Sequence, residues 1–167
     1  MPDKKTIERA KKDKQEGKAA STQAGEFVRE EMHHIREGKH GARSPQQAIA
    51  IGLSKARRAG VDLPPPEEGK VTDKSRKSAE QAYRRGHSKG AKRKPSARRS
   101  KAVHRALERE GSHAASGAAL SRQTKAAARR RTAADRSAAA KKAVRTKGHA
   151  GLSRAAHKAA RTRAARV

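Results

Sequence analysis

The large hydrophobic residues of this chain are concentrated in one short stretch, residues 21–63. Within it, Val28, Met32 and Ile35 recur at the i, i+4, i+7 spacing that places side chains on one face of a helix. Gly38 follows them and is typical of a helix end, because glycine adopts left-handed backbone angles without steric cost. The pattern predicts one amphipathic helix that ends near Gly38.

A second helix is predicted to begin a few residues later. Ser44 can cap its free amides, Pro45 suits the first helical position, and Gln47 completes a capping box. Gly60 marks the end of this helix. One apolar stripe runs along it, formed by Ile49, Gly52, Leu53 and Ala56. Two antiparallel helices with a short connection make a helical hairpin over residues 21–63.

The predicted hairpin core is small. Ile51 lies roughly 200° from Ile49 on a helical wheel and needs a separate cover. Units of about 40 residues seldom fold without further support. We expect a second copy of the hairpin to supply it and give a homodimer, and a helix from the rest of the chain packing back is the alternative. The predicted core residues are Val28, Met32, Ile35, Ile49 and Leu53.

The remaining segments have a different composition. Residues 1–20 form a charged lead, and residues 64–69 begin with three prolines that favour an extended linker. Residues 70–167 form an arm rich in Ala, Lys and Arg, which we expect to be disordered or only locally helical when free. Local helices are plausible over 73–85, 96–110, 118–145 and 152–166. The expected fold class is mainly α, with no sheet.

Charge separates the hairpin from the arm. The chain has 44 Lys and Arg against 16 Asp and Glu, a net charge of +28. Residues 21–69 hold seven bases and seven acids, whereas residues 70–167 hold 30 bases and 5 acids. Solubility of a small domain needs only about 2–8 net charges. Because the common cellular polyanions are nucleic acids, the arm predicts nucleic-acid binding.

We expect contacts to phosphates without reading of base sequence. The arm has one aromatic residue, Tyr83, and no zinc-finger spacing or signature of an RNA-binding fold. The second hairpin helix offers only Gln46 and Gln47 at its start, where a recognition helix contacts bases. The candidate phosphate-binding residues are Lys92, Arg93, Lys94, Arg98, Arg99, Arg129, Arg130, Arg131, Lys141, Lys142, Arg145, Lys147, Arg154, Arg161, Arg163 and Arg166.

Other chemistry has little support. The chain contains no cysteine, phosphate-binding loop or dinucleotide-binding turn. We therefore expect no enzymatic activity, no cofactor and no small-molecule substrate. Glu30 and His33 have the i, i+3 spacing of some metal sites. They belong to a charged group with His34, Glu37 and His40 for which a solvent-facing surface is the favoured interpretation, and we expect no bound metal.

The first residues lack the apolar stretch of a secretory signal, and the arm offers mainly alanine to a lipid surface. We expect no membrane partner and a cytoplasmic, nucleoid-associated location.

Two resemblances add to this picture. The blocks GEFVREEMHHIREGKHGARS at 25–44 and QAIAIGLSKARRAG at 47–60 resemble a family of small basic bacterial proteins of unassigned function. That resemblance implies a helical pair and carries over no functional residue. The arm resembles the tails of linker histones and bacterial histone-like proteins in composition, although it is richer in Arg and poorer in Pro.

These features predict a histone-like protein that binds DNA without sequence preference and compacts or bridges it. One alternative is an RNA- or ribosome-associated protein. Another is a protein-interaction module in which the arm serves only for localisation.

Overall fold

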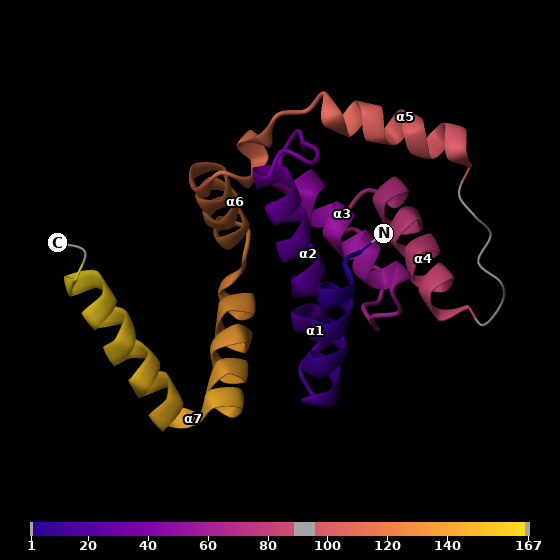
Figure 1. Cartoon of the computed structure of the whole chain (residues 1–167). Helices are drawn as coiled ribbons and strands as arrows, with labels where there is room; N and C mark the ends of the chain where they lie inside the picture. The colour runs from indigo at the N-terminus through magenta and orange to yellow at the C-terminus, as the bar shows by residue number, and fades with distance from the viewer. Residues whose placement is uncertain (1, 89–95, 166–167) are drawn as a thin grey trace. The chain divides into compact units, whose positions relative to one another are not determined.

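The computed structural model describes residues 2–88 and 96–165 and shows a mainly α fold (Figure 1). Seven α-helices and one 3-10 turn, with no strand, occur in those two ranges. The chain divides into two compact units, Met1–Gln123 and Thr124–Val167, each described here by itself. The elements are α1 (Lys4–Gln15), α2 (Ala20–Arg36), α3 (Pro45–Arg58), α4 (Asp73–His87), α5 (Ala97–Glu108), η1 (Ser112–Ala115), α6 (Gly117–Arg129) and α7 (Ala133–Ala164).

Helices α2 and α3 form the centre of the first unit. Helix α3 begins at Pro45, and the Ser44 side chain accepts a hydrogen bond from the Gln47 amide at 3.2 Å, as predicted. The Gln47 side chain accepts from the Arg43 amide at 2.8 Å, one residue before the position that a capping box requires. The two helices approach closely at Gly52. A Cβ atom at that position would lie 2.7 Å from the Val28 Cα. Glycine is therefore needed there for the two backbones to pack together.

Two apolar clusters lie along this helix pair. The first contains the buried Met32 and Ile35, with Val28 and Ile49 partly buried beside them. The second surrounds Phe27, whose exposed fraction is 1%. The remaining members of the two clusters are Ala42, Ala48, Ala114, Ala115 and Leu120 in the first, and Ile7, Ala10, Ala20, Ala24, Leu53, Ala56, Val61 and Leu63 in the second.

The first unit extends beyond residues 21–63 toward the N-terminus. Helix α1 lies within the stretch expected to be a charged lead, and it packs against α2. Thr6 and Ala10 are buried in that contact. The Arg9 Nε atom also donates to the Glu26 Oε2 atom at 2.5 Å. This N-terminal helix therefore covers one side of the Phe27 cluster.

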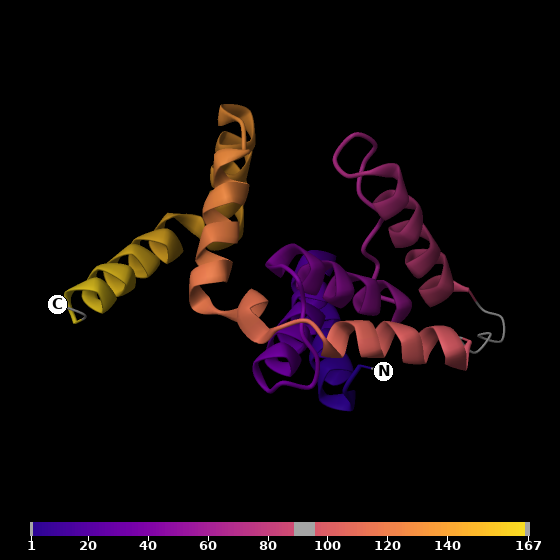
Figure 2. The same ribbon diagram turned by 90° about the horizontal axis from the view of Figure 1, so that it is seen from above.

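The unit also extends toward the C-terminus. Helix α4 packs on α3 and buries Ala79 and Ala82. Seen from above, α5 extends outward from the helix pair, with one end beside it (Figure 2). The Gly41 amide donates to the Leu107 carbonyl oxygen at 2.9 Å, which fixes the α2–α3 loop to the end of α5. The structure thus shows elements of the arm packing back on the hairpin, and the homodimer stays a prediction.

The structure does not support the disordered alternative for the arm. The described residues of the arm, 70–88 and 96–165, are predominantly helical. Alanine is the best helix former, and local caps reinforce it. Thr132 and Asp135 form a capping box at the start of α7. Repulsion between like charges opposes such helices, and alanine content and caps outweigh it.

None of the helices in the described ranges combines the length and hydropathy needed to span a membrane.

Candidate nucleic-acid interface

Helix α7 is the main basic surface of the second unit. It runs for 32 residues without a buried side chain. Along it lie nine Lys or Arg and one acid, Asp135, a net charge of +8. The acid belongs to the capping box at the first turn. The rest of the helix therefore presents cations to solvent along its whole length.

A bend at Gly148 divides α7 into two straight segments, drawn in orange and yellow in Figure 1. The residue has φ 65° and ψ 170°, angles that favour glycine. After the bend, Arg154, Lys158 and Arg161 are spaced i, i+4, i+7 and share one helix face. Three cations one turn apart on one face suit contact with successive phosphates.

Cations before the bend are distributed around the helix. They are Arg136, Lys141, Lys142, Arg145 and Lys147. All five are exposed. The segment before the bend therefore has no single basic face, in contrast to the segment after it.

The other predicted phosphate-binding residues are scattered. Arg98 and Arg99 are exposed at the start of α5, in the first unit. Arg129 closes α6, and the exposed Arg130 and Arg131 follow it in the second unit. Arg163 is exposed near the end of α7. Lys92, Arg93, Lys94 and Arg166 lie outside the described residues.

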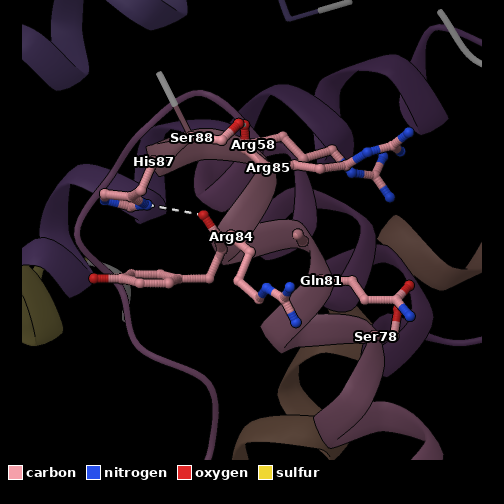
Figure 3. Close-up of a pocket in the computed structure, with 9 residues that line it drawn as sticks. Arg58, Ser78, Gln81, Arg84, Arg85, His87 and Ser88 are labelled. Carbon is pink, nitrogen blue, oxygen red and sulfur yellow. Dashed lines mark hydrogen bonds between the residues drawn. The ribbon is translucent and has the colours of Figure 1, made fainter. Parts of the chain in front are cut away.

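An open cavity in the first unit forms a second basic surface. It has a volume of about 830 Å³ and lies between the end of α3 and the C-terminal half of α4. Arg58 from α3 and Arg84 and Arg85 from α4 line it, as Figure 3 shows. None of the described residues that line this cavity is acidic. We call this surface the arginine pocket.

Close packing of α4 on α3 produces the arginine pocket. A Cβ atom at Gly86 would lie 1.8 Å from the Arg57 carbonyl oxygen, so the two backbones touch there. Partial loss of contact with water lowers the pKa of the Arg58 guanidinium, and repulsion from Arg85 lowers it further. A bound phosphate would relieve that repulsion, because it places negative charge between the two cations.

Tyr83 and His87 form one wall of the arginine pocket, and His87 is labelled at the left of Figure 3. Their rings stack with centroids 4.0 Å apart and planes 25° apart. The Tyr83 hydroxyl donates to the Asp62 Oδ1 atom at 2.6 Å, and this hydrogen bond raises the pKa of Tyr83. The stacked pair holds one side of the cavity in place.

Sequence reasoning did not find the arginine pocket. Arg58 lies in the neutral hairpin segment and Arg84–Arg85 in the arm, so only tertiary contact brings them together. Arg57, the residue before Arg58, is buried and donates to the carbonyl oxygens of Leu63 and Pro64 at 3.1 and 3.2 Å. The adjacent basic pair at the end of a helix was the only local signal.

Comparison with known protein families finds a match to one part of the chain. Residues 19–67 match the model of a family of unknown function (DUF6496). The match covers α2, α3 and the first part of the proline-rich linker, and it includes both blocks from which the resemblance to an unassigned family was inferred. No curated protein and no solved structure matches the chain.

Proposed function

We propose that this protein binds duplex nucleic acid, DNA in preference to RNA, through phosphates and without reading base sequence. The observation that carries the proposal is α7, a solvent-exposed helix of 32 residues with nine cations and one acid. Binding would release the counterions condensed on the duplex, which is the main source of sequence-independent affinity. Bridging or compaction of DNA would follow if separate parts of one chain engage separate duplexes.

The composition of the exposed surface favours a duplex over a single strand. Single-strand binding proteins stack bases on aromatic side chains. The one Phe of this chain is buried in the core, and the one Tyr is stacked on His87. The exposed cations can contact phosphates, which position a protein on nucleic acid without conveying sequence.

A second contact for phosphate is proposed at the arginine pocket. Its three arginines come from two helices that are fixed against each other, and arginine binds phosphate through a planar array of donors. Helix α7 and the arginine pocket belong to different units, so substitutions in α7 leave the pocket residues unchanged.

The test measures binding of the full chain to a labelled duplex DNA by fluorescence anisotropy. In the α7 variant, Arg154, Lys158 and Arg161 are replaced by Gln. In the control, the exposed α1 residues Lys4, Lys5 and Lys11 are replaced by Gln, which changes the net charge equally. We expect the α7 variant to lose on the order of tenfold or more in affinity at low salt and the control to lose markedly less.

Equal losses in the two variants would show that net charge matters and the α7 face does not. Competition decides between nucleic acids. A duplex DNA that displaces the probe better than a structured RNA at physiological salt supports the proposal. A clear RNA preference would instead support the RNA- or ribosome-associated alternative.

A further inference from the structure

A carboxylate and two imidazoles meet in the first unit, at the end of α2. Glu31 has an exposed fraction of 0%, and the side chains of His34 and His40 are 13% and 11% exposed. The Glu31 Oε2 atom lies 3.5 Å from the His40 Nε2 atom, and Glu31 Oε1 lies 3.8 Å from His34 Nδ1. One donor atom from each residue lies within 4.8 Å of the other two. We call these three residues the Glu-His-His cluster.

Local sequence explains how the cluster forms. His34 follows Glu31 by three residues and so lies on the same face of α2. Gly38 then adopts φ 72°, and the Lys39 amide donates to the His34 carbonyl oxygen at 2.9 Å. This left-handed helix end turns the chain back. His40 thereby returns to the side of Glu31, one turn beyond the helix.

Each histidine has a partner on its outer nitrogen. The His40 Nδ1 atom lies 3.1 Å from the Gly41 carbonyl oxygen, which can only accept a hydrogen bond. The proton of a neutral His40 ring is therefore on Nδ1, and Nε2 presents a lone pair to Glu31. The His34 Nε2 atom lies 3.5 Å from the Asp3 Oδ2 atom. Histidines that ligate metals are held in this way, by a carbonyl or a carboxylate on the far nitrogen.

The Glu31 Oε2 atom supplies a second, independent observation. It is buried and has no hydrogen-bond partner among the described residues. It faces the lone pair of a neutral His40, so two acceptors oppose each other across 3.5 Å. Buried carboxylate oxygens are costly unless a donor or a cation compensates them. A cation between Glu31 and His40 would satisfy both groups.

Charge around the cluster points to a divalent ion. Three carboxylates gather there, from Asp3, Glu30 and Glu31, and one cation, Lys55, contacts Glu30 and Glu31. With neutral histidines the local sum is minus two. A dication would bring it to zero, and it would compensate carboxylates of which Glu31 is fully buried and Glu30 nearly so.

We propose that Glu31, His34 and His40 bind one divalent transition-metal ion of the zinc class. Two imidazoles and a carboxylate suit such ions and leave one position for water. Neighbouring donors of a tetrahedral zinc site lie roughly 3.4 Å apart. One Glu31 oxygen lies 3.5 Å from the His40 Nε2 atom, the other lies 3.8 Å from the His34 Nδ1 atom, and one donor from each residue lies within 4.8 Å of the other two. The ion would hold the α2–α3 loop against α2. Asp3 is a positioning residue that orients His34.

The test uses the full chain, washed at high salt to remove nucleic acid, stripped with a chelator and titrated with Co²⁺ and Zn²⁺. We expect uptake of one Co²⁺ per chain with visible ligand-field absorption, which one equivalent of Zn²⁺ abolishes. We also expect the thermal midpoint of unfolding to rise on addition of Zn²⁺, because an ion that binds only the folded chain stabilises it. Circular dichroism of the stripped protein checks that it remains folded.

Variants separate this cluster from ordinary surface histidines. His40→Asn and Glu31→Gln should weaken binding by on the order of a hundredfold or more, since removal even of an outer partner costs about 10–100-fold. Asp3→Asn should weaken it by about tenfold. The matched control is His33→Asn, which removes the exposed neighbour on α2 and should leave affinity within about twofold.

Two results would overturn the proposal. One is a folded wild-type chain that takes up no Co²⁺ or Zn²⁺. In that case bound protons, and not a metal ion, compensate the negative charge of the Glu-His-His cluster. The other is equal loss of affinity in His33→Asn and His40→Asn, which identifies an adventitious surface site. Should His40→Asn fail to fold, the Asp3→Asn and His33→Asn pair still decides, because both residues are exposed.

Discussion

Helices α2 and α7 are both well formed, yet different forces form them. Helix α2 buries seven of its 17 residues, among them Phe27 and Ile35. Helix α7 buries none of its 32 residues, is rich in alanine and is capped at its start by Thr132 and Asp135. The first is held by tertiary packing, and the second by intrinsic propensity and its cap. A substitution should therefore affect the whole first unit when it falls in α2, and only its own turn when it falls in α7.

The largest difference is expected for loss of a core side chain. Phe27→Ala removes the most buried aromatic group and should cost about 3–5 kcal/mol of the free energy of unfolding. Leu152→Ala in α7 should cost far less, because Leu152 is half-exposed on a helix without a core. Urea unfolding followed by circular dichroism measures both variants. Similar losses in the two would show that α7 packs like α2.

The close approach of α2 and α3 predicts that replacement of glycine by alanine changes stability in opposite directions at two positions. Gly52→Ala places a methyl group against the Val28 backbone and should destabilise the unit by about 1–3 kcal/mol. Gly25→Ala on the outer face of α2 meets nothing within 4 Å and should stabilise by up to about 1 kcal/mol. Thermal unfolding of the two variants gives the signs. Destabilisation by both would mean that helix separation at Gly52 is not the cause.

Removal of a helix cap distinguishes the two regions on a smaller scale. Ser44→Ala in the packed unit and Thr132→Ala in α7 each remove a side chain that caps a helix, a loss of about 1 kcal/mol. We expect Ser44→Ala to speed amide exchange throughout α2 and α3, and Thr132→Ala to speed it only in the first turns of α7. Thr146→Ala within α7 serves as the control. Its hydroxyl bonds only to the Lys142 carbonyl oxygen one turn back.

The smallest effect concerns Tyr83, whose phenol pKa is raised by the hydrogen bond to Asp62, with burial and the Asp62 charge adding. The fold favours the neutral phenol. The stabilisation from this hydrogen bond is therefore fully present below the ordinary tyrosine pKa, and it is lost as pH rises through the raised pKa of Tyr83. Asp62→Asn should move the absorbance titration toward pH 10. The signal is clean because the chain has one Tyr and no Trp. An unmoved midpoint would contradict the geometry of the pocket wall.

The sequence predicted features that depend on neighbouring residues. The start of α3 at Pro45 and the mainly helical class follow from cap residues and apolar spacing. The break between the two segments of α7 falls at Gly148, inside the gap between the local helices predicted to end at 145 and begin at 152. Local signals of this kind need no knowledge of the tertiary fold.

Features that depend on distant contacts were not predicted. The core includes Ala114 and Ala115 from η1, and a pair of alanines in an alanine-rich arm has no distinguishing pattern. The solvent-facing interpretation of the charged group at the end of α2 holds for His33 and Glu37, which are exposed. It is wrong for Glu30, which is buried, and for His34 and His40, which are largely covered. His40 joins Glu31 and His34 only after the chain reverses at Gly38. The arginine pocket likewise needs α4 to pack on α3.

The most direct test of phosphate binding by the basic surface is the salt dependence of affinity for duplex DNA, measured with the full chain between 50 and 200 mM salt. If about six phosphates are neutralised, affinity falls on the order of a thousandfold over that range. The Arg154, Lys158 and Arg161 to Gln variant should lower the slope of log affinity against log salt by roughly 2–3. Undetectable binding in dilute buffer, or an affinity that salt leaves unchanged, would contradict the account.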